Sequence, residues 1–239
     1  MIEWLGAVET VEVKVAIAVL WLALVGLAAI GVDRLVPQGS ELVRKVVHIG
    51  TGNIVLLAWW MKIPGWIGMS AGIFFAIVTL ASYRFQLLPR IDNVGRKSYG
   101  TFFYAVSIAI LVGYFWGVNR PEFGVLGILV MTWGDGLAGL VGKRFGRNRY
   151  HLWGMQKSWE GSVTMAIVGT LVSALVLSTI VDSQVQLITI AFTVGILSAV
   201  LEAFSNLGID NLTVPILSAA IAYTLVNLIL FNLIQFYLT

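Results

Sequence analysis

Short polar breaks divide the sequence into roughly eight apolar stretches, each about long enough to cross the hydrocarbon core of a bilayer. The stretches span residues 11–32, 46–61, 64–81, 101–118, 122–142, 163–181, 185–204 and 212–238. Lipid offers no partner to an unpaired backbone N–H or C=O group, so each stretch is expected to be an α-helix. The pattern predicts an all-α fold, a polytopic transmembrane bundle of about eight helices.

Composition supports this interpretation and removes several kinds of chemistry. Of the 239 residues, 59% are hydrophobic and 11% are charged, whereas soluble domains carry roughly a quarter charged residues. The absence of cysteine excludes disulfides, thiolate nucleophiles and cysteine-based metal sites. No long polar linker separates the stretches, so we expect residues 1–239 to form a single membrane-embedded domain, with no nucleic-acid partner.

Lysine and arginine gather in alternate loops. Twelve of the 15 basic residues lie in the loops that follow the first, third and fifth stretches. They are Arg34, Arg44, Lys45, Arg84, Arg90, Arg96, Lys97, Lys143, Arg144, Arg147, Arg149 and Lys157. Because short cytoplasmic loops collect basic residues, we expect these loops on the cytoplasmic side and both termini on the opposite side. The loop after the seventh stretch has no basic residue, and the even helix count alone assigns its side.

Asp135 is the first candidate for chemistry, because an ionisable group at membrane depth is costly. Glycines flank it, and the basic segment 143–149 follows, then Lys157 and Glu160 at the start of the sixth stretch. A carboxylate that holds Mg²⁺, with cations that neutralise phosphate oxygens, is what a metal-bound nucleoside triphosphate requires. The alternatives are a carboxylate paired for helix packing, and arginines that serve only topology and anionic lipid. No Walker A loop occurs.

Two further polar clusters interrupt apolar sequence on the same expected face. Residues 201–215 include Glu202, Asp210 and Asn211, and a short polar turn would also explain part of this cluster. Residues 41–53 include His48, which is a candidate proton acceptor or phosphate contact. A helix cap or an interhelical hydrogen bond is an equal alternative for His48.

These motifs together resemble a known family. The segments 134–146 and 157–162 resemble the signature of membrane CTP-dependent lipid kinases and phosphatidate cytidylyltransferases. Glu202 followed by residues 210–215 is similar to the phytol kinase branch, and residues 41–48 look like the opening of phytol kinase and dolichol kinase sequences. The resemblance reaches across residues 41–215. It implies transfer of the terminal phosphate of CTP, with UTP as an alternative donor, to phytol or a similar isoprenoid alcohol such as geranylgeraniol or farnesol.

The resemblance also implies roles for particular residues. Asp135 and Asp210 become Mg²⁺ ligands, and Lys157 becomes a phosphate contact. The remaining assignments are Glu160 as a supporting ligand or an orienter of Lys157, Glu202 as a candidate base or a structural partner, Arg144 and Arg149 as phosphate contacts, and Asn211 as a support of its turn. The product would feed prenyl-lipid and tocopherol synthesis. Whether the chain forms a homo-oligomer stays open.

Three rival functions remain at this point. A phosphatidate cytidylyltransferase would share the metal and CTP contacts, but the late motif here lacks the arginine that typically follows its aspartate, Asp210. The chain is short for a dolichol kinase. A transporter would distribute polar residues along a path through the membrane midplane, whereas here they crowd one end.

Overall fold

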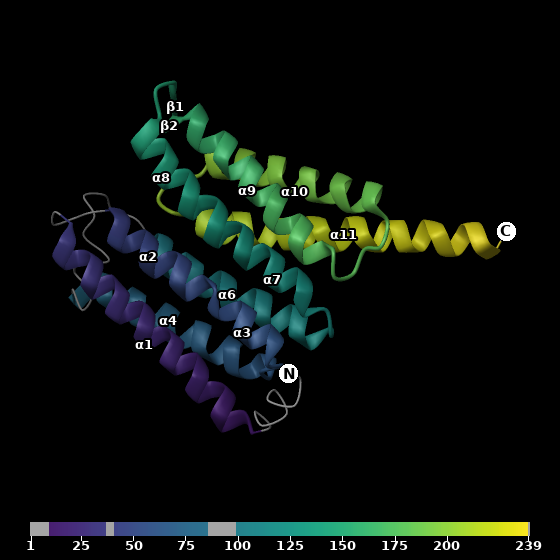
Figure 1. Ribbon diagram of the computed structural model, residues 1–239, viewed down its shortest axis with the longest axis horizontal. Coiled ribbons are helices and arrows are strands. Elements are labelled where there is room, and N and C mark those ends of the chain that lie inside the picture. The colour runs from purple at the N-terminus through teal and green to yellow at the C-terminus, as the bar shows by residue number, and fades with distance from the viewer. Residues whose placement is uncertain (1–9, 37–40, 86–98, 239) are drawn as a thin grey trace.

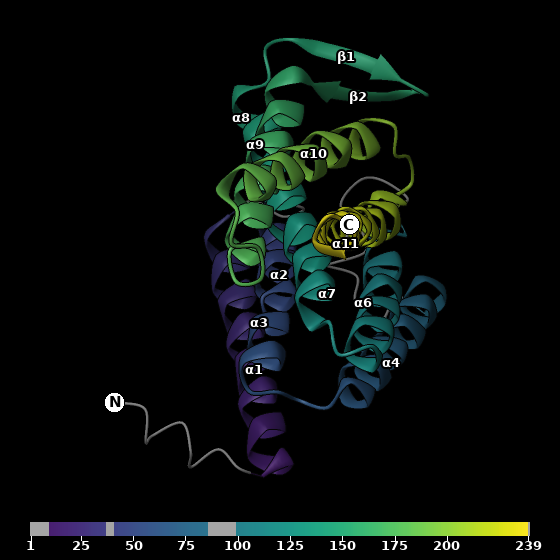
Figure 2. The same ribbon diagram turned by 90° about the vertical axis from the view of Figure 1, so that its right-hand side faces the viewer.

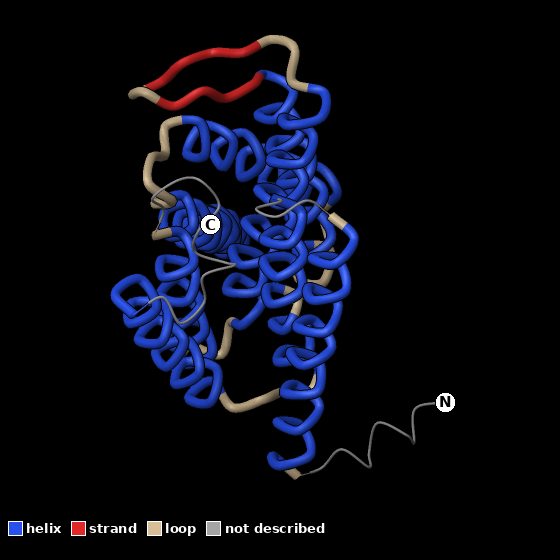
Figure 3. The backbone as a smooth tube through the Cα atoms, turned by 90° about the vertical axis from the view of Figure 1, so that its left-hand side faces the viewer, coloured by secondary structure: helices blue, strands red, loops and turns tan. Residues whose placement is uncertain are grey.

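The computed structural model describes residues 10–36, 41–85 and 99–238, and for Arg84 and residues 230–238 the backbone alone. Helices dominate these residues (Figures 1 and 3). In chain order they are α1 (Val11–Leu35), α2 (Glu41–Gly52), α3 (Ile54–Trp60), α4 (Gly65–Phe85), α6 (Gly100–Gly117), α7 (Pro121–Leu129), η2 (Val130–Asp135), α8 (Gly136–Phe145), α9 (Trp159–Leu177), α10 (Gln184–Ala203) and α11 (Asp210–Leu238). The strands β1 (Arg149–Leu152) and β2 (Met155–Ser158) separate α8 from α9.

The continuous run of α7, η2 and α8 forms the centre of the bundle. Pro121 opens α7, and every later residue of the helix is buried. Phe123 and Leu126 have no exposed surface. Gly127 lets α11 come close, because a Cβ atom there would lie 2.2 Å from the carbonyl oxygen of Pro215. A helix that is apolar on all sides is expected at the core of a bundle, and the other helices surround this one.

Seven helical segments of the described residues are long and apolar enough to cross a membrane. They are α1, α4, α6, the run from α7 to α8, α9, α10 and α11. The predicted all-α fold is confirmed, and the eight predicted stretches correspond to these seven segments plus the pair α2 and α3. In Figure 1, α1 begins and α11 ends away from the end of the bundle that carries the strands.

The second predicted stretch, residues 46–61, is divided into two short helices. Asn53 separates α2 from α3, and its side chain donates to the carbonyl of Ile49 at 3.0 Å and accepts from Trp133 Nε1 at 3.0 Å. An asparagine side chain that bonds to the local backbone competes with the helical ladder. The division ties the end of α2 to η2 in the central helix.

A two-stranded antiparallel hairpin covers one end of the bundle (Figure 2). Trp153 and Gly154 form its turn with φ values of 47° and 78°, which is the left-handed pair that a two-residue type I′ hairpin requires. The register pairs Tyr150 with Lys157. Sequence analysis assigned this segment to a basic loop and did not predict the strands.

Candidate active site

A polar cavity of about 810 Å³ lies at the hairpin end of the bundle. Its walls come from α2, the start of α6, α8, the hairpin, the start of α9 and the turn between α10 and α11. Five basic and four acidic side chains line it: Arg44, Lys45, Lys143, Arg149, Lys157, Glu41, Asp135, Glu202 and Asp210. The volume is in the range of small-molecule sites, and its mixed charge suits a ligand that carries both signs.

Asp135 enters this cavity at the end of a π-helical segment, η2. A π-turn holds more residues than an α-turn, so it rotates the next helix relative to the preceding one, and such turns are frequent at functional sites. Here the carboxylate faces α2 rather than lipid. Its Oδ2 atom lies 2.6 Å from Lys45 Nζ.

Lys45 is the partner that makes a carboxylate at this depth tolerable. Its side chain is only 2% exposed, and Nζ also donates to the carbonyl oxygen of Asp135 at 2.9 Å. Gly139, one turn further along, leaves the space for this side chain, because a Cβ atom there would lie 2.8 Å from Lys45 Cε. A glycine at 139 is therefore a condition of the ion pair as well as of helix packing.

His48 stands behind Asp135 and does not line the cavity. Its Nε2 atom lies 3.6 Å from Asp135 Oδ2 and 3.3 Å from the carbonyl oxygen of Met131. The ring packs on Tyr104 at 4.5 Å, and the Tyr104 hydroxyl contacts Thr132 Oγ1 at 2.5 Å. Because a carbonyl can only accept, this contact assigns the proton of the neutral ring to Nε2, which donates to Met131 and ties α2 to η2. The Asp135 carboxylate lies beside the ring, beyond hydrogen-bond distance.

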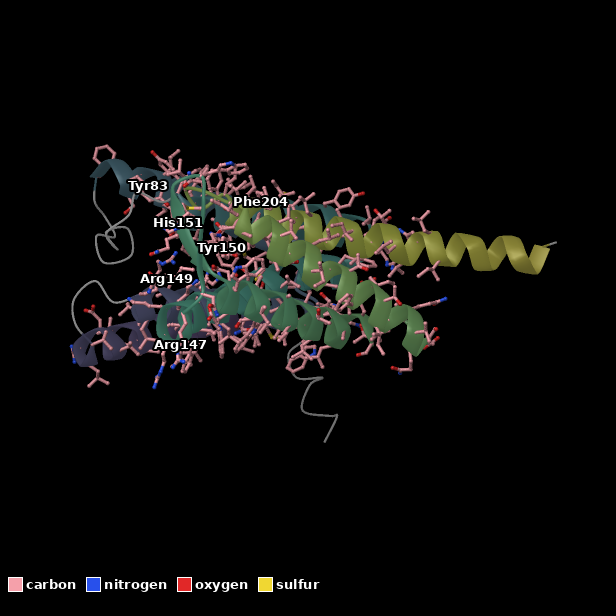
Figure 4. The ribbon with its side chains drawn as sticks, turned by 90° about the horizontal axis from the view of Figure 1, so that it is seen from above. Tyr83, Arg147, Arg149, Tyr150, His151 and Phe204 are labelled. Atoms are coloured by element: carbon pink, nitrogen blue, oxygen red, sulfur yellow. The ribbon has the colours of Figure 1, made fainter. Side chains whose placement is uncertain are left out.

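Lys157 and Glu202 form a second ion pair across the cavity wall. Lys157 Nζ lies 2.6 Å from Glu202 Oε1 and also donates to the carbonyl oxygen of Glu202. Lys157 belongs to β2 and Glu202 to the last turn of α10, so the pair attaches the hairpin to the bundle. The Trp153 ring packs edge-on against Phe204, with the ring centroids 5.7 Å apart. Figure 4 labels Phe204 together with the β1 residues Arg149, Tyr150 and His151.

Asp210 opens α11 and lines the same cavity. Its Oδ1 atom accepts from the backbone N–H and the Nδ2 of Asn211, each at 3.0 Å. Asn211 is buried, and its Nδ2 also lies 3.3 Å from the carbonyl oxygen of Gly208. These contacts tie Asn211 to the turn and orient the Asp210 carboxylate.

Arg44 adds a cation on the α2 side of the cavity. Its Nε atom donates to Glu41 Oε1 at 3.1 Å. Burial works against the charge of Arg44, but the hydrogen bond and the charge of Glu41, with Asp135 and Asp210 beyond, raise the pKa of its guanidinium. Arg44 therefore stays charged beside the carboxylates.

The remaining predicted contacts divide between the cavity and its surroundings. Arg149 lines the cavity and donates to Gln156 Oε1 at 3.0 Å. Arg144 is exposed beside the ring of Phe145 and is not part of the lining. Glu160 also lies outside the lining: its Oε1 atom accepts from the backbone N–H groups of Arg147 and Asn148, each at 3.1 Å. The structure gives Glu160 a role in shaping the turn before β1.

Two of the four carboxylates that line the cavity, Asp135 and Asp210, suit Mg²⁺ bound to a phosphorylated ligand. Within the described residues, no group of three histidine, aspartate or glutamate side chains could hold a metal ion alone. Mg²⁺ commonly takes one or two carboxylates and fills its remaining positions with water and substrate phosphate oxygens. Asp135 and Asp210 fit the arrangement in which two carboxylates are completed by water and phosphate oxygens.

Lys45 is the functional residue that sequence analysis missed. It was counted among the basic residues of a cytoplasmic loop, although it precedes His48 by three positions and therefore shares its helix face. That spacing was the available signal. Lys143 on α8 also lines the cavity, as do Gln156 and Ser158 on β2, which the folding of the hairpin brings there.

This geometry defines a class of protein: a helical membrane-type bundle with a paired-charge cavity at one end. Comparison with known proteins narrows the class. A phytol kinase of Synechocystis sp. is 51% identical over 211 residues, which cover 88% of this chain and 91% of that protein. A probable chloroplastic phytol kinase of Triticum aestivum is 30% identical, covering 80% of this chain and 69% of that protein.

The chain belongs to the phytol kinase family. A chloroplastic farnesol kinase of Arabidopsis thaliana is also similar, at 27% identity over 78% of this chain and 66% of that protein. No protein-family model matches the chain, and no solved structure matches it significantly.

Loss of one partner from the Lys45–Asp135 pair should destabilise the fold more than loss of both. We expect Lys45→Met to cost about 3–5 kcal/mol, because it leaves a carboxylate buried without its cation. The double variant Lys45→Met with Asp135→Asn should recover part of that loss. Thermal unfolding midpoints in detergent measure the difference, with Lys14→Met on α1 as the control. Simple addition of the two single effects would contradict a direct pair.

Proposed function

We propose that the protein is a Mg²⁺-dependent kinase of an isoprenoid alcohol. It transfers the terminal phosphoryl group of CTP, with UTP as an alternative donor, to the hydroxyl of phytol or a related alcohol such as geranylgeraniol or farnesol. The similarity to proteins named phytol kinase and farnesol kinase supports the acceptor class. The product would enter prenyl-lipid and tocopherol synthesis.

The observation that carries this proposal is the pairing of charges inside the cavity. Lys45 with Asp135 and Lys157 with Glu202 each place a cation and a carboxylate within 2.6 Å. A metal-bound triphosphate also presents both signs, so it can exchange partners with these pairs: cations turn to phosphate oxygens and carboxylates to the metal. A bare anion would leave the carboxylates opposed to its own charge.

Mg²⁺ would be held by Asp135 and Asp210, and it would offset the negative charge that develops on the phosphate oxygens. Lys157 and Arg149 on the hairpin bind the phosphates, and Arg44 and Lys45 do so from the α2 side. Until the ligand binds, Lys45 pairs with the Asp135 carboxylate. These residues supply positioning and charge, which phosphoryl transfer mainly requires of a protein.

The alcohol would arrive laterally from the bilayer, with its hydroxyl directed into the cavity. Of the two candidate bases, Glu202 lines the cavity and His48 does not. Release of Lys157 to the phosphates would free the Glu202 carboxylate to accept the hydroxyl proton. We place the cavity on the cytoplasmic face, with both termini opposite, because the basic residues crowd this end.

The deciding assay separates the two reactions that CTP could undergo here. Purified protein with Mg²⁺ and γ-labelled CTP should transfer label to phytol, geranylgeraniol or farnesol. The same panel includes dolichol, diacylglycerol and phosphatidic acid. Label on an isoprenoid alcohol supports the kinase proposal. Label found in pyrophosphate with phosphatidic acid alone would instead indicate a cytidylyltransferase, and no nucleotide turnover would favour transport.

Asp135→Asn should lower the rate of phosphoryl transfer about 100-fold or more. The neutral amide neither binds the metal strongly nor forms an ion pair with Lys45. Asp182→Asn is the matched control, since Asp182 is exposed in the connection between α9 and α10. Amounts of inserted protein are compared by membrane fractionation. Near-normal turnover by the Asp135 variant would reject its assignment as a metal ligand.

Lys157→Ala should act mainly on nucleotide affinity. Loss of one charge-assisted contact to phosphate should raise the apparent KM for CTP about tenfold, with a smaller change in the KM for the alcohol. Arg147→Ala removes a neighbouring exposed cation outside the cavity lining and serves as the control. An unchanged CTP dependence at full rate would exclude Lys157 as a phosphate contact.

A further inference from the structure

A second hollow lies outside the polar cavity, along the paired helices α4 and α6. It is a groove of about 460 Å³ with no charged side chain in its lining. The lining residues are Met69, Ile73, Ala76, Ile77, Leu80, Phe102, Val106, Ala109, Ile110, Gly113 and Tyr114. The proposed nucleotide chemistry does not use this groove.

The groove has a floor of small residues between walls of large ones. Ala76 and Ala109 are buried at the floor, whereas Ile77 and Ile110 are 63% and 47% exposed on the walls. Gly72 lets the helices meet behind the floor, because a Cβ atom there would lie 2.9 Å from the Cβ of Ala109. The groove forms because the two backbones approach closely while the large side chains on either side project outward. It is open along its length.

The groove and the polar cavity are lined by consecutive residues at the start of α6. Thr101 lines the cavity, and its neighbour Phe102 lines the groove. The backbone N–H of Tyr99 donates to the carbonyl oxygen of Leu207 at 3.0 Å, and Leu207 also lines the cavity. Tyr83, near the end of α4, lies at the hairpin end of the molecule in Figure 4. Two adjacent residues at the start of α6 therefore belong to different sites: Thr101 to the charged cavity and Phe102 to the apolar groove.

We propose that the α4–α6 groove binds the isoprenoid chain of the alcohol, with the hydroxyl at the Thr101 end; this inference rests on the proposed function. From Leu80 to Met69 the helix rise gives roughly 16 Å of apolar channel. An uncharged branched chain buries its surface there, and its polar end reaches the cavity rim. The far end at Met69 and Gly113 limits the chain length that fits completely.

Two substitutions test the groove at different depths. Gly113→Leu fills the far end, where a Cβ atom would meet only the flexible Met69 side chain, with Sδ at 2.8 Å. It should lower kcat/KM for phytol and geranylgeraniol about tenfold and spare farnesol and geraniol. Val106→Phe lies nearer the cavity and should also lower kcat/KM for farnesol. Neither variant should change the KM for CTP.

Gly117→Leu is the matched control, one turn beyond Gly113 on α6, where a Cβ atom meets nothing within 4 Å. It lies outside the groove lining, so its chain-length profile should equal that of the wild type. Thermal midpoints in detergent establish that all three variants are folded. Uniform loss with every alcohol, or an unchanged profile in both groove variants while the wild type remains active, would overturn the groove assignment.

A second readout does not depend on turnover. A geranylgeraniol analogue with a diazirine at the end of its chain, photolysed on the wild-type protein, should label peptides of α4 and α6. Excess phytol should suppress that labelling, whereas excess phosphatidylcholine should not. Labelling suppressed equally by both lipids would mean that the groove holds bulk lipid. A wild-type protein that labels α4 and α6 but transfers no phosphate would refute the proposed function and leave the binding site intact.

Discussion

The ion pair between Lys45 and Asp135 is the contact around which the functional end of this protein is built. Two opposite charges 2.6 Å apart, one of them 2% exposed, would each be costly alone in an apolar bundle. Together they attach α2 to the central helix at the point where η2 ends. Gly139 leaves the space that this pair needs, and His48 contacts the Met131 carbonyl on the side of Asp135 away from the cavity.

The hairpin repeats this arrangement on the other side of the cavity. Lys157 on β2 meets Glu202 at the end of α10, so a small exposed element is attached to a membrane-length helix by charge. Ser158 then caps α9 by accepting from the N–H of Gly161 at 3.1 Å. Gly142 and Gly161 bring α8 and α9 together just below, where a Cβ atom on Gly142 would lie 3.6 Å from Gly161 Cα. Small residues thus position the charged ones.

Hydropathy was sufficient to predict the helices, because backbone pairing in lipid leaves a long apolar stretch few alternatives. It also placed Asp135, Lys157, Glu202 and Asp210 on one face, and all four line one cavity. The pattern could not show the π-turn at η2, where Met131 and Thr132 contact His48 and Tyr104 from other helices. It missed the hairpin because the signal, Trp153–Gly154 between two four-residue alternating segments, is short and was obscured by basic residues.

A binding site whose charges are already paired accepts only a ligand that can replace those ion pairs. A ligand must break the Lys45–Asp135 and Lys157–Glu202 contacts before it can use either partner, so each new contact replaces an existing one and adds little affinity by itself. A molecule with a single sign of charge frees one partner of each pair and leaves the other unmatched, which is strongly unfavourable in a buried site. A ligand with both signs matches both partners. Under the proposed function, selection of a metal-bound triphosphate over simple anions would arise from this exchange rather than from the strength of any one contact.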